Sequence, residues 1–414
     1  MTSVRTPLVS LAVNKFSRHS DRTLNAYRLR KSKSWPAPCP GRSVIDRYAV
    51  ENGDRRHMQA FRPVLDALRD DCARYFGVPS VELQPFEPAV RRFSTVLKVQ
   101  VQGGRFSSCV FVKIHTPQRQ AVDERDRLRR RVTEEFSIAT RVRAHFAAHS
   151  GLSAVRPIAA FPDHLAIVME EAPGETLLRL LARRASWMPQ PRTVDQLCRI
   201  THDIGRWLRV FQRLDVPGRR LSLDAMREYI DVRLVMLVRS RRAGFSAADR
   251  SAILRFFDEQ SRGVAGDRLE EVLIHADLSL SNVLVDETTV TVIDFGEPKY
   301  DAAHHDLTHL YMQLGLLAAK PQFSRGVIQR LQASLLTGFD RDLDPDEPMF
   351  RLLWLKHALC HYATLATRGA RPAERIYNWH LQRQHRRWVG ALLEGKASRR
   401  PSSNDDGHHR AARP

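Results

Sequence analysis

The sequence has few cysteines, no long apolar run and no internal repeat, and each of these absences argues against a class of protein. The five cysteines among 414 residues lie far apart and never form a C-x-x-C pair, so a disulfide framework or a zinc ribbon is not expected. No stretch approaches the roughly 18 consecutive apolar residues of a membrane-spanning helix, and the N-terminus has no hydrophobic signal core. Because 43% of the residues are apolar, the chain is not disordered throughout. We therefore predict a soluble, cytoplasmic protein with two lobes or domains.

Acidic residues are also scarce relative to basic ones, with 46 Asp and Glu against 66 Lys and Arg, a formal net charge of +20. Residues 1–57 hold 12 basic and 4 acidic residues, and residues 396–414 hold 5 and 2, so more than half of the excess lies in two terminal segments. These segments have little apolar periodicity, and we expect both to be poorly ordered.

A basic excess of this size fits a nucleic acid, an anionic membrane surface or an acidic substrate as the partner. Its concentration in the tails, and the absence of an RNP-like run, a zinc finger or a basic zipper, argue against nucleic acid. The alternative, nucleic-acid association through the tails, predicts salt-sensitive binding that disappears when both tails are deleted.

Between the tails, the apolar spacing predicts a sheet-rich part followed by a helical part. Residues 58–76 have the spacing of an amphipathic helix, and residues 95–101 and 108–115 alternate like the strands of a hairpin. The other predicted elements are a long charged helix over 121–149, strands near 154–161 and 164–170, and a strand-rich insertion at 271–294 within an otherwise helical part. We predict an α+β protein with an N-terminal extension (1–57), an N-lobe (58–170), a C-lobe (171–395) and a tail (396–414).

The stretch from His275 to Gly296 carries the most informative polar residues. Asp277, Asn282 and Asp294 lie at the ends of short hydrophobic strands, which would hold them at a common edge. Hard oxygen ligands of this kind suit Mg²⁺, which takes one or two protein oxygens and completes its shell with water and substrate phosphates. Phosphoryl transfer needs such a metal together with a carboxylate that orients the attacking hydroxyl group. As an alternative, aspartates often cap turns, but a turn does not require the shared spacing with Asn282.

The pattern H-x-D-x-x-x-x-N with I-D-F-G behind it resembles the aminoglycoside phosphotransferase and choline kinase group, the small-molecule branch of the protein-kinase-like fold. The resemblance implies a bilobal fold, with a small β-rich N-lobe containing one long helix and a larger, mainly helical C-lobe. It implies that Asp277 is the catalytic carboxylate and that Asn282 and Asp294 bind Mg²⁺. His275 would support the catalytic loop, and Asp306 would anchor it.

The same resemblance covers residues about 90–310 and extends to a nucleotide site. Lys113 is a lone lysine in an apolar strand, and a buried ammonium needs a partner. The resemblance implies that Lys113 holds the α- and β-phosphates and pairs with a glutamate of the following helix. We choose Glu135, because apolar residues follow it at helical spacing, with Glu134 as the alternative. The segment from Val168 to Leu177 would be the hinge, where the carbonyl group of Glu170 and the amide of Ala172 would bind the adenine.

One expected part is missing, because no glycine-rich phosphate loop precedes the strand of Lys113. The chain reads Ala-Val-Arg-Arg-Phe-Ser-Thr over 89–95. Ser94 and Thr95 could contact phosphate through their hydroxyl and amide groups. Arg91 and Arg92 are either extra positive charges near the phosphates or plain surface residues.

The composition of the predicted C-lobe bears on the acceptor. Residues 301–395 contain 12 Lys and Arg and 9 Asp and Glu, and a polycationic aminoglycoside would need an acidic cleft. A neutral or anionic acceptor fits better, such as a sugar, a sugar phosphate or a glycan end at a membrane. Tryptophans 379 and 388, near three arginines, would give a peripheral membrane contact or else belong to an ordinary helix.

We therefore predict a phosphotransferase that moves the γ-phosphoryl group of ATP, or of GTP, to a hydroxyl group of a small molecule or glycan, with Mg²⁺ as the cofactor. The alternative is a nucleotide-binding pseudokinase or interaction module without turnover. The sequence leaves the oligomeric state open.

Overall fold

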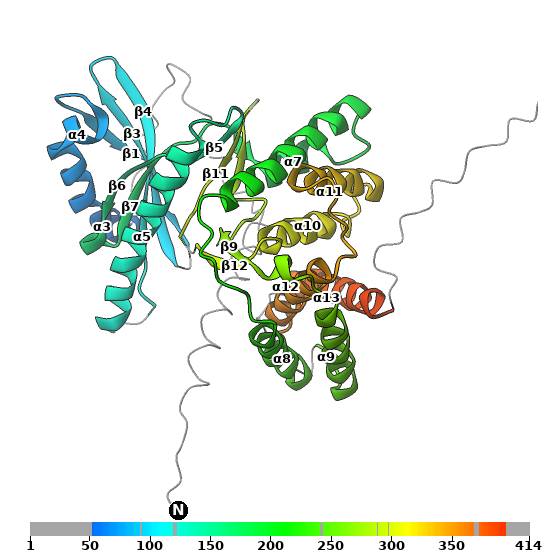
Figure 1. Cartoon of the computed structure of the whole chain (residues 1–414). Coiled ribbons are helices and arrows are strands. Elements are labelled where there is room, and N and C mark those ends of the chain that lie inside the picture. Colours follow the sequence, from blue (N-terminus) through cyan, green and yellow to red (C-terminus); the bar gives the residue numbers. More distant parts are fainter. Residues whose placement is uncertain are drawn as a thin grey trace, which may run out of the picture. The chain divides into compact units, whose positions relative to one another are not determined.

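A computed structural model describes residues 52–91, 93–118, 122–240, 243–287, 289–296, 298–367 and 372–394 (Figure 1). Most of the predicted N-terminal extension and the whole predicted tail lie outside these residues, and so does Arg92. The predictions of poor order for the two tails concern segments that the structure does not describe.

The described elements form an α+β protein, as the sequence predicts, with an antiparallel sheet in the N-terminal region and a mainly helical C-terminal region. The strands, in chain order, are β1 (Glu82–Pro85), β2 (Ala89–Val90), β3 (Ser94–Gly103), β4 (Phe106–His115), β5 (Leu152–Ala154), β6 (Pro157–Phe161), β7 (Ala166–Glu170), β8 (Glu175–Thr176), β9 (Glu271–Ile274), β10 (Val283–Val285), β11 (Val290–Val292) and β12 (Lys299–Ala302). The α-helices are α3 (Asn52–Asp70), α4 (Cys72–Phe76), α5 (Val122–Phe146), α6 (Leu177–Arg184), α7 (Pro191–Gln212), α8 (Leu223–Arg239), α9 (Ala247–Arg262), α10 (His305–Leu317), α11 (Arg325–Phe339), α12 (Pro348–Thr367) and α13 (Pro372–Leu393). Short 3₁₀ helices occupy Pro162–His164 and Gly266–Leu269.

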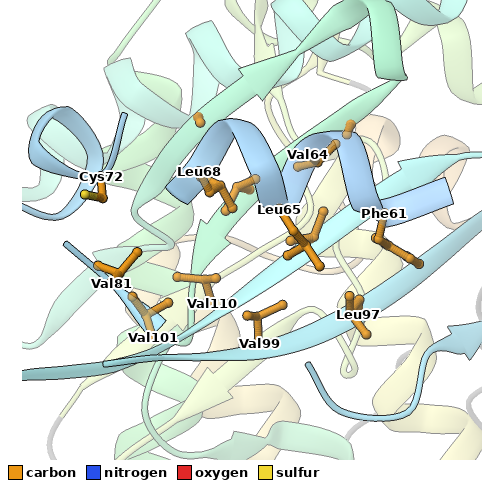
Figure 2. Close-up of a cluster of buried hydrophobic side chains, with 14 residues drawn as sticks. Phe61, Val64, Leu65, Leu68, Cys72, Val81, Leu97, Val99, Val101 and Val110 are labelled. Atoms are coloured by element: carbon orange, nitrogen blue, oxygen red, sulfur yellow. The ribbon is translucent and has the colours of Figure 1, made fainter. Parts of the chain in front are cut away.

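The first sheet is antiparallel in the order β1-β3-β4-β7-β6, with β2 paired to β3. Alternate residues of a strand point to opposite faces of the sheet. Valines 99 and 101 of β3 and 110 and 112 of β4 therefore face one side, where they form a buried cluster with α3 (Figure 2). Phe61 and Leu68 supply the helix side of this cluster and are fully buried. The predicted amphipathic helix is thus present, but it begins at Asn52 and gives way to α4 at Cys72.

The other face of this sheet receives the charged side chain of Lys113. Lys113 follows Val112 in β4, so the alternation of the strand places it opposite the α3 cluster. The long charged helix α5 packs against β5, β6 and β7. The same strand thus builds an apolar core on one face and carries a buried cation on the other.

Short strands at the site form two further sheets. One has the order β5-β11-β10-β8, and the other pairs β9 with β12. The insertion predicted over 271–294 is therefore strand-rich, as expected, but its pairing was not predictable from spacing. β11 runs parallel to β5, a strand that lies more than a hundred residues earlier in the chain, and β12 lies beyond the predicted insertion. Such pairing depends on long-range packing rather than on local sequence.

The chain divides into two compact units, described separately below. The helical unit contains α8, α9, α12 and α13, and the sheet unit contains the described residues of 52–221 and 270–341. This division does not test the predicted lobe boundary at residue 170, which stays a prediction. Among the described residues, no helix has the length and apolar character needed to cross a membrane.

Close contact between α7 and α11 depends on two glycines in the sheet unit. A side-chain carbon at Gly338 would collide with the backbone of His202, and one at Gly205 would collide with the backbone of Leu335. A backbone cannot move aside as the end of a flexible side chain can. The small size of glycine is therefore what lets these two helices approach.

We expect Gly338→Ala to lower the free energy of unfolding by about 1–3 kcal/mol, because the added methyl group overpacks the α7–α11 contact. Gly326→Ala on the same helix is the matched control, since its new carbon would have only an ordinary contact with Ser324. Urea unfolding followed by circular dichroism measures both. Equal stability of the two variants would contradict the role of Gly338.

Two buried histidines of the helical unit make it sensitive to acid. His361 of α12 and His385 of α13 lie with Nδ1 and Nε2, respectively, 2.6 Å apart. Burial lowers the pKa of His361 to about 4, and burial and the neighbouring His361 lower the pKa of His385 well below its ordinary value. The pair is therefore neutral at pH 7, and the N–H group of one ring donates a hydrogen bond to the unprotonated nitrogen of the other.

Histidines of an unfolded chain titrate near pH 6.5, so the neutral pair stabilises the unit fully above about pH 6.5 and progressively less toward pH 4. We expect His361 alone to cost about 2 kcal/mol of unfolding free energy between about pH 7 and pH 5. Urea unfolding at several pH values measures this loss. The double variant His361→Leu with His385→Phe should remove this contribution to the pH dependence, whereas His380→Gln, at an exposed position of α13, should preserve it. An unchanged slope in the double variant would refute this origin.

Candidate active site

The centre of the candidate site is a buried lysine held between two carboxylates. The Nζ atom of Lys113 lies 2.8 Å from Oε1 of Glu135 on α5 and 2.7 Å from Oδ1 of Asp294 after β11. The side chains of Lys113 and Glu135 are 8% and 1% exposed, whereas that of Asp294 is 26% exposed. Three segments far apart in the sequence therefore meet at one ammonium group.

His115 completes the surroundings of Glu135. Its Nε2 atom lies 3.2 Å from Oε2 of Glu135, and its side chain is buried. Burial lowers the pKa of His115, and its hydrogen bond to Glu135 only partly offsets this effect, so the ring is neutral and donates from Nε2. Burial alone would raise the pKa of Glu135, but the charge of Lys113 and the hydrogen bond from His115 outweigh it and set the value at about 2. Glu135 is thus a carboxylate at neutral pH.

The catalytic loop predicted after β9 is fixed by Asp306 at the start of α10. The two carboxylate oxygens of Asp306 accept hydrogen bonds from the backbone amides of His275, at 2.7 Å, and Ala276, at 3.0 Å. Asp306 is fully buried. Burial raises its pKa to about 7, against the two amide donors, which favour the ionised form. The carboxylate therefore anchors two successive peptide groups of the loop from within the fold.

His275 joins the loop to the strand that precedes Asp294. Its Nε2 atom lies 3.0 Å from the carbonyl oxygen of Ile293, which can only accept, so Nε2 carries the proton. The unprotonated Nδ1 is then 3.4 Å from the backbone amide of Asp277. His275 therefore links the loop to the end of β11, and the supporting role that the resemblance implies for it stays a prediction.

Asp277, Asn282 and Asp294 are gathered by the pairing of β10 with β11. The pairing of Val283 with Val292 puts Asn282 beside Ile293, whose amide donates to the carbonyl of Asn282 at 3.0 Å. The side-chain amide of Asn282 donates to the carbonyl oxygen of Asp277 at 2.8 Å. The three residues thus share one edge, as the sequence predicts.

Two residues of this edge have left-handed backbone conformations although they are not glycine. The φ angles of Ala276 and Asp294 are 64° and 69°. Such conformations cost of order 1–3 kcal/mol and persist only where the surroundings impose them. The Asp306 hydrogen bond to Ala276 and the Lys113 ion pair with Asp294 are the contacts that impose them here.

The predicted nucleotide residues lie near Lys113 in the strand register. β3 pairs with β4 so that Val96 is opposite Lys113, Thr95 opposite Ile114 and Ser94 opposite His115. The β2–β3 connection therefore reaches the same end of the sheet as the lysine. Both Ser94 and Thr95 are 9% exposed.

The predicted hinge connects β7 to β8. Glu170 ends β7, and Ala172 lies in the loop that follows. Gly174 closes this loop with φ at 96°, and a side chain there would strike the carbonyl group of Val285 in β10. Glycine is required at this position for both reasons.

Further residues that contact the site lie outside any short sequence motif. Gln313 on α10 accepts the amide hydrogen of Leu280 at 3.0 Å, and so fixes the loop between Asp277 and Asn282. Lys98 of β3, 3% exposed, pairs with Glu171 of the hinge loop at 2.7 Å. A lone buried lysine in an alternating strand was the available signal for Lys98, as it was for Lys113. Glu134, the alternative to Glu135, is exposed on α5.

The oxygen atoms of Asn282 and Asp294 fit a hard divalent cation. The Nδ2 atom of Asn282 faces Asp277, which leaves its Oδ1 atom as a ligand, and Asp294 is the partly exposed carboxylate of the site. Two protein oxygens are what Mg²⁺ usually takes beside phosphates. Among the described residues, no group of three or more His, Cys, Asp or Glu forms a fuller metal site.

Comparison with known proteins gives the family. The chain is similar to solved structures of the aminoglycoside phosphotransferase APH(2'')-Ib with ADP bound (13% identity, 80% of this chain and 97% of that chain, TM-score 0.45) and of a microcompartment-associated aminopropanol kinase (16%, 81% and 99%, TM-score 0.46). It is also similar to amicoumacin kinase hAmiN in complex with AMP-PNP, Ca²⁺ and Ami (14%, 82% and 96%, TM-score 0.47). No curated protein matches the chain. A model described as the phosphotransferase enzyme family matches residues 97–343, more than half of the chain, which therefore belongs to the phosphotransferase enzyme family.

Proposed function

We propose that this protein transfers the γ-phosphoryl group of ATP to a hydroxyl group of a small molecule or glycan. The observation that carries the proposal is the arrangement around Lys113, in which one buried ammonium joins Glu135 of α5 to Asp294 at the edge shared with Asp277. Phosphoryl transfer depends mainly on positioning and charge stabilisation, and this arrangement supplies both. GTP is the alternative donor.

Asp277 is the residue that we assign to the acceptor. Its backbone is held by His275 and Asn282, and its carboxylate would accept or orient the proton of the attacking hydroxyl group. Asn282 and Asp294 would hold Mg²⁺, which neutralises charge on the phosphates when bound. Lys113 would hold the α- and β-phosphates. Glu135 would keep the ammonium group of Lys113 in position for these contacts.

Residues of β3 and of the loop after β7, the two strands that flank β4, would also bind the nucleotide. Ser94 and Thr95 would supply hydroxyl and amide donors to the phosphates in place of a glycine-rich loop. The carbonyl group of Glu170 and the amide of Ala172 would bind the adenine. Asp306 and His275 would act through the loop, without touching the substrate.

The acceptor that we propose is neutral or anionic. Residues 301–395 have no acidic excess that would attract a polycationic aminoglycoside. Trp379 is 57% exposed, with the guanidinium carbon of Arg383 5.6 Å from its ring centre, so a peripheral membrane contact at this position stays a prediction. Incubating the protein with ATP, Mg²⁺ and hydroxylated metabolites, antibiotics and glycan fragments, and detecting phosphorylated products by mass, would identify the acceptor.

A pseudokinase that binds nucleotide without turnover is the second candidate, favoured by the missing glycine-rich loop. Titration with ATP and Mg²⁺ under thermal unfolding, together with a turnover assay, separates the two candidates. Stabilisation without turnover on any acceptor would favour the pseudokinase.

We expect Asp277→Asn to lower kcat by about 100-fold or more, because the side chain can no longer take up a proton from the acceptor. Asp294→Ala should abolish transfer through loss of a metal ligand. Asp286→Asn, at an exposed aspartate between β10 and β11, is the matched control and should keep full activity. The assay is transfer to the identified acceptor, with circular dichroism to verify folding. Full turnover in both active-site variants would refute the mechanism.

Glu135→Gln should lower kcat/KM for ATP by about tenfold or more, because it removes one of the two charges that hold the Lys113 ammonium. Glu134→Gln, one residue earlier on the exposed side of α5, should leave kcat/KM within about twofold of the original value. Initial rates at varied ATP measure both. Similar losses in the two variants would contradict a specific role for Glu135.

A further inference from the structure

Arg233 is a buried cation in the interior of the helical unit. It lies on the face of α8 that also carries Ile230 and Leu237, and only 3% of the residue is exposed. This face packs against α12, whose Lys356 is 8% exposed. Two positively charged side chains thus occupy the interface of two helices.

The groups that the Arg233 guanidinium contacts are neutral. Its guanidinium group donates to the hydroxyl oxygen of Tyr229 at 3.2 Å, approaches the sulfur of Met236 at 3.6 Å and adjoins the thiol of Cys360. Burial raises the pKa of Tyr229, so its hydroxyl group supplies no negative charge at neutral pH. Among the described residues, no carboxylate contacts the Arg233 guanidinium.

Two carboxylates of α8 and α9 are engaged with other arginines. Asp258 binds Arg227 through two hydrogen bonds of 2.6 and 3.2 Å, and Asp231 binds Arg250 through two of 2.5 and 2.7 Å. These pairs are more exposed than Arg233, the cation that most needs an anion. An arginine stays protonated inside a protein, so burial without an anion costs several kcal/mol.

Arg233, Lys356 and Tyr229 form a cluster in which both positive charges lie close to the tyrosine ring. The guanidinium carbon of Arg233 lies 4.7 Å from the ring centre, and the Nζ atom of Lys356 lies 5.9 Å from it. Tyr229 and Cys360 are only partly buried, and the hydroxyl oxygen of Tyr229 lies 3.2 Å from the sulfur of Cys360. An oxyanion arriving there would meet a guanidinium fork and a hydroxyl donor.

We propose that Arg233, with Tyr229 and Lys356, forms a binding site for a phosphate or carboxylate group. The ligand supplies the anion that the fold does not provide, and Arg233 makes the charge-assisted hydrogen bonds to it. The ligand is a small free anion such as inorganic phosphate.

The test is thermal unfolding of the full-length protein, titrated with inorganic phosphate at constant ionic strength set by chloride. We expect a saturable rise in the midpoint. Arg233→Met should weaken the apparent affinity for phosphate by about tenfold or more, the effect of losing one charge-assisted hydrogen bond. Without phosphate, the same variant should be at least as stable as the original, because it removes a buried charge that lacks an anion.

Two controls separate this site from other effects. Arg239→Met removes an exposed arginine of the same helix and should leave the phosphate response unchanged. Lys113→Met removes the cation of the candidate active site, so any phosphate response that this variant keeps is independent of the phosphotransferase proposal. Absence of a saturable response, its persistence in Arg233→Met, or a marked loss of stability of that variant without phosphate would overturn the site.

Discussion

Compensation of the Lys113 charge is the constraint on which the candidate site depends. A buried ammonium is costly unless anions lie close to it, so the fold must bring Glu135 and Asp294 to the same point. This requirement fixes the position of α5 relative to β4, and it fixes the position of the segment that follows β11. The low pKa of Glu135, about 2, is the electrostatic counterpart of the same contact.

A second set of contacts fixes the loop rather than the charge. Asp306 binds two successive backbone amides, and Gln313 binds a third from the same helix, so α10 determines where Asp277 and Asn282 lie. Left-handed conformations at Ala276 and Asp294 are tolerated because these contacts outweigh their cost. Asp277 and Asn282 are thus positioned by contacts of their loop with α10.

The two units treat buried cations differently. In the sheet unit, Lys113 and Lys98 each contact a carboxylate from another segment. In the helical unit, Arg233 contacts only neutral groups among the described residues. A cation paired within the fold contributes to its structure, whereas one without an anion is suited to an external ligand. This contrast makes Arg233 stand out among the charged residues.

Local sequence was enough to determine the α+β class, the α3, β3, β4 and α5 elements, and the motif that contains Asp277, Asn282 and Asp294. Apolar periodicity and strand-end polar residues are short-range signals, and they carry this information directly. The choice of Glu135 over Glu134 also followed from helical periodicity. Only the tertiary structure decided the parallel pairing of β11 with β5, the roles of His115 and Gln313, and the pairing of Lys98 with Glu171. These contacts join residues remote in sequence, and their stability comes from burial that no local pattern encodes.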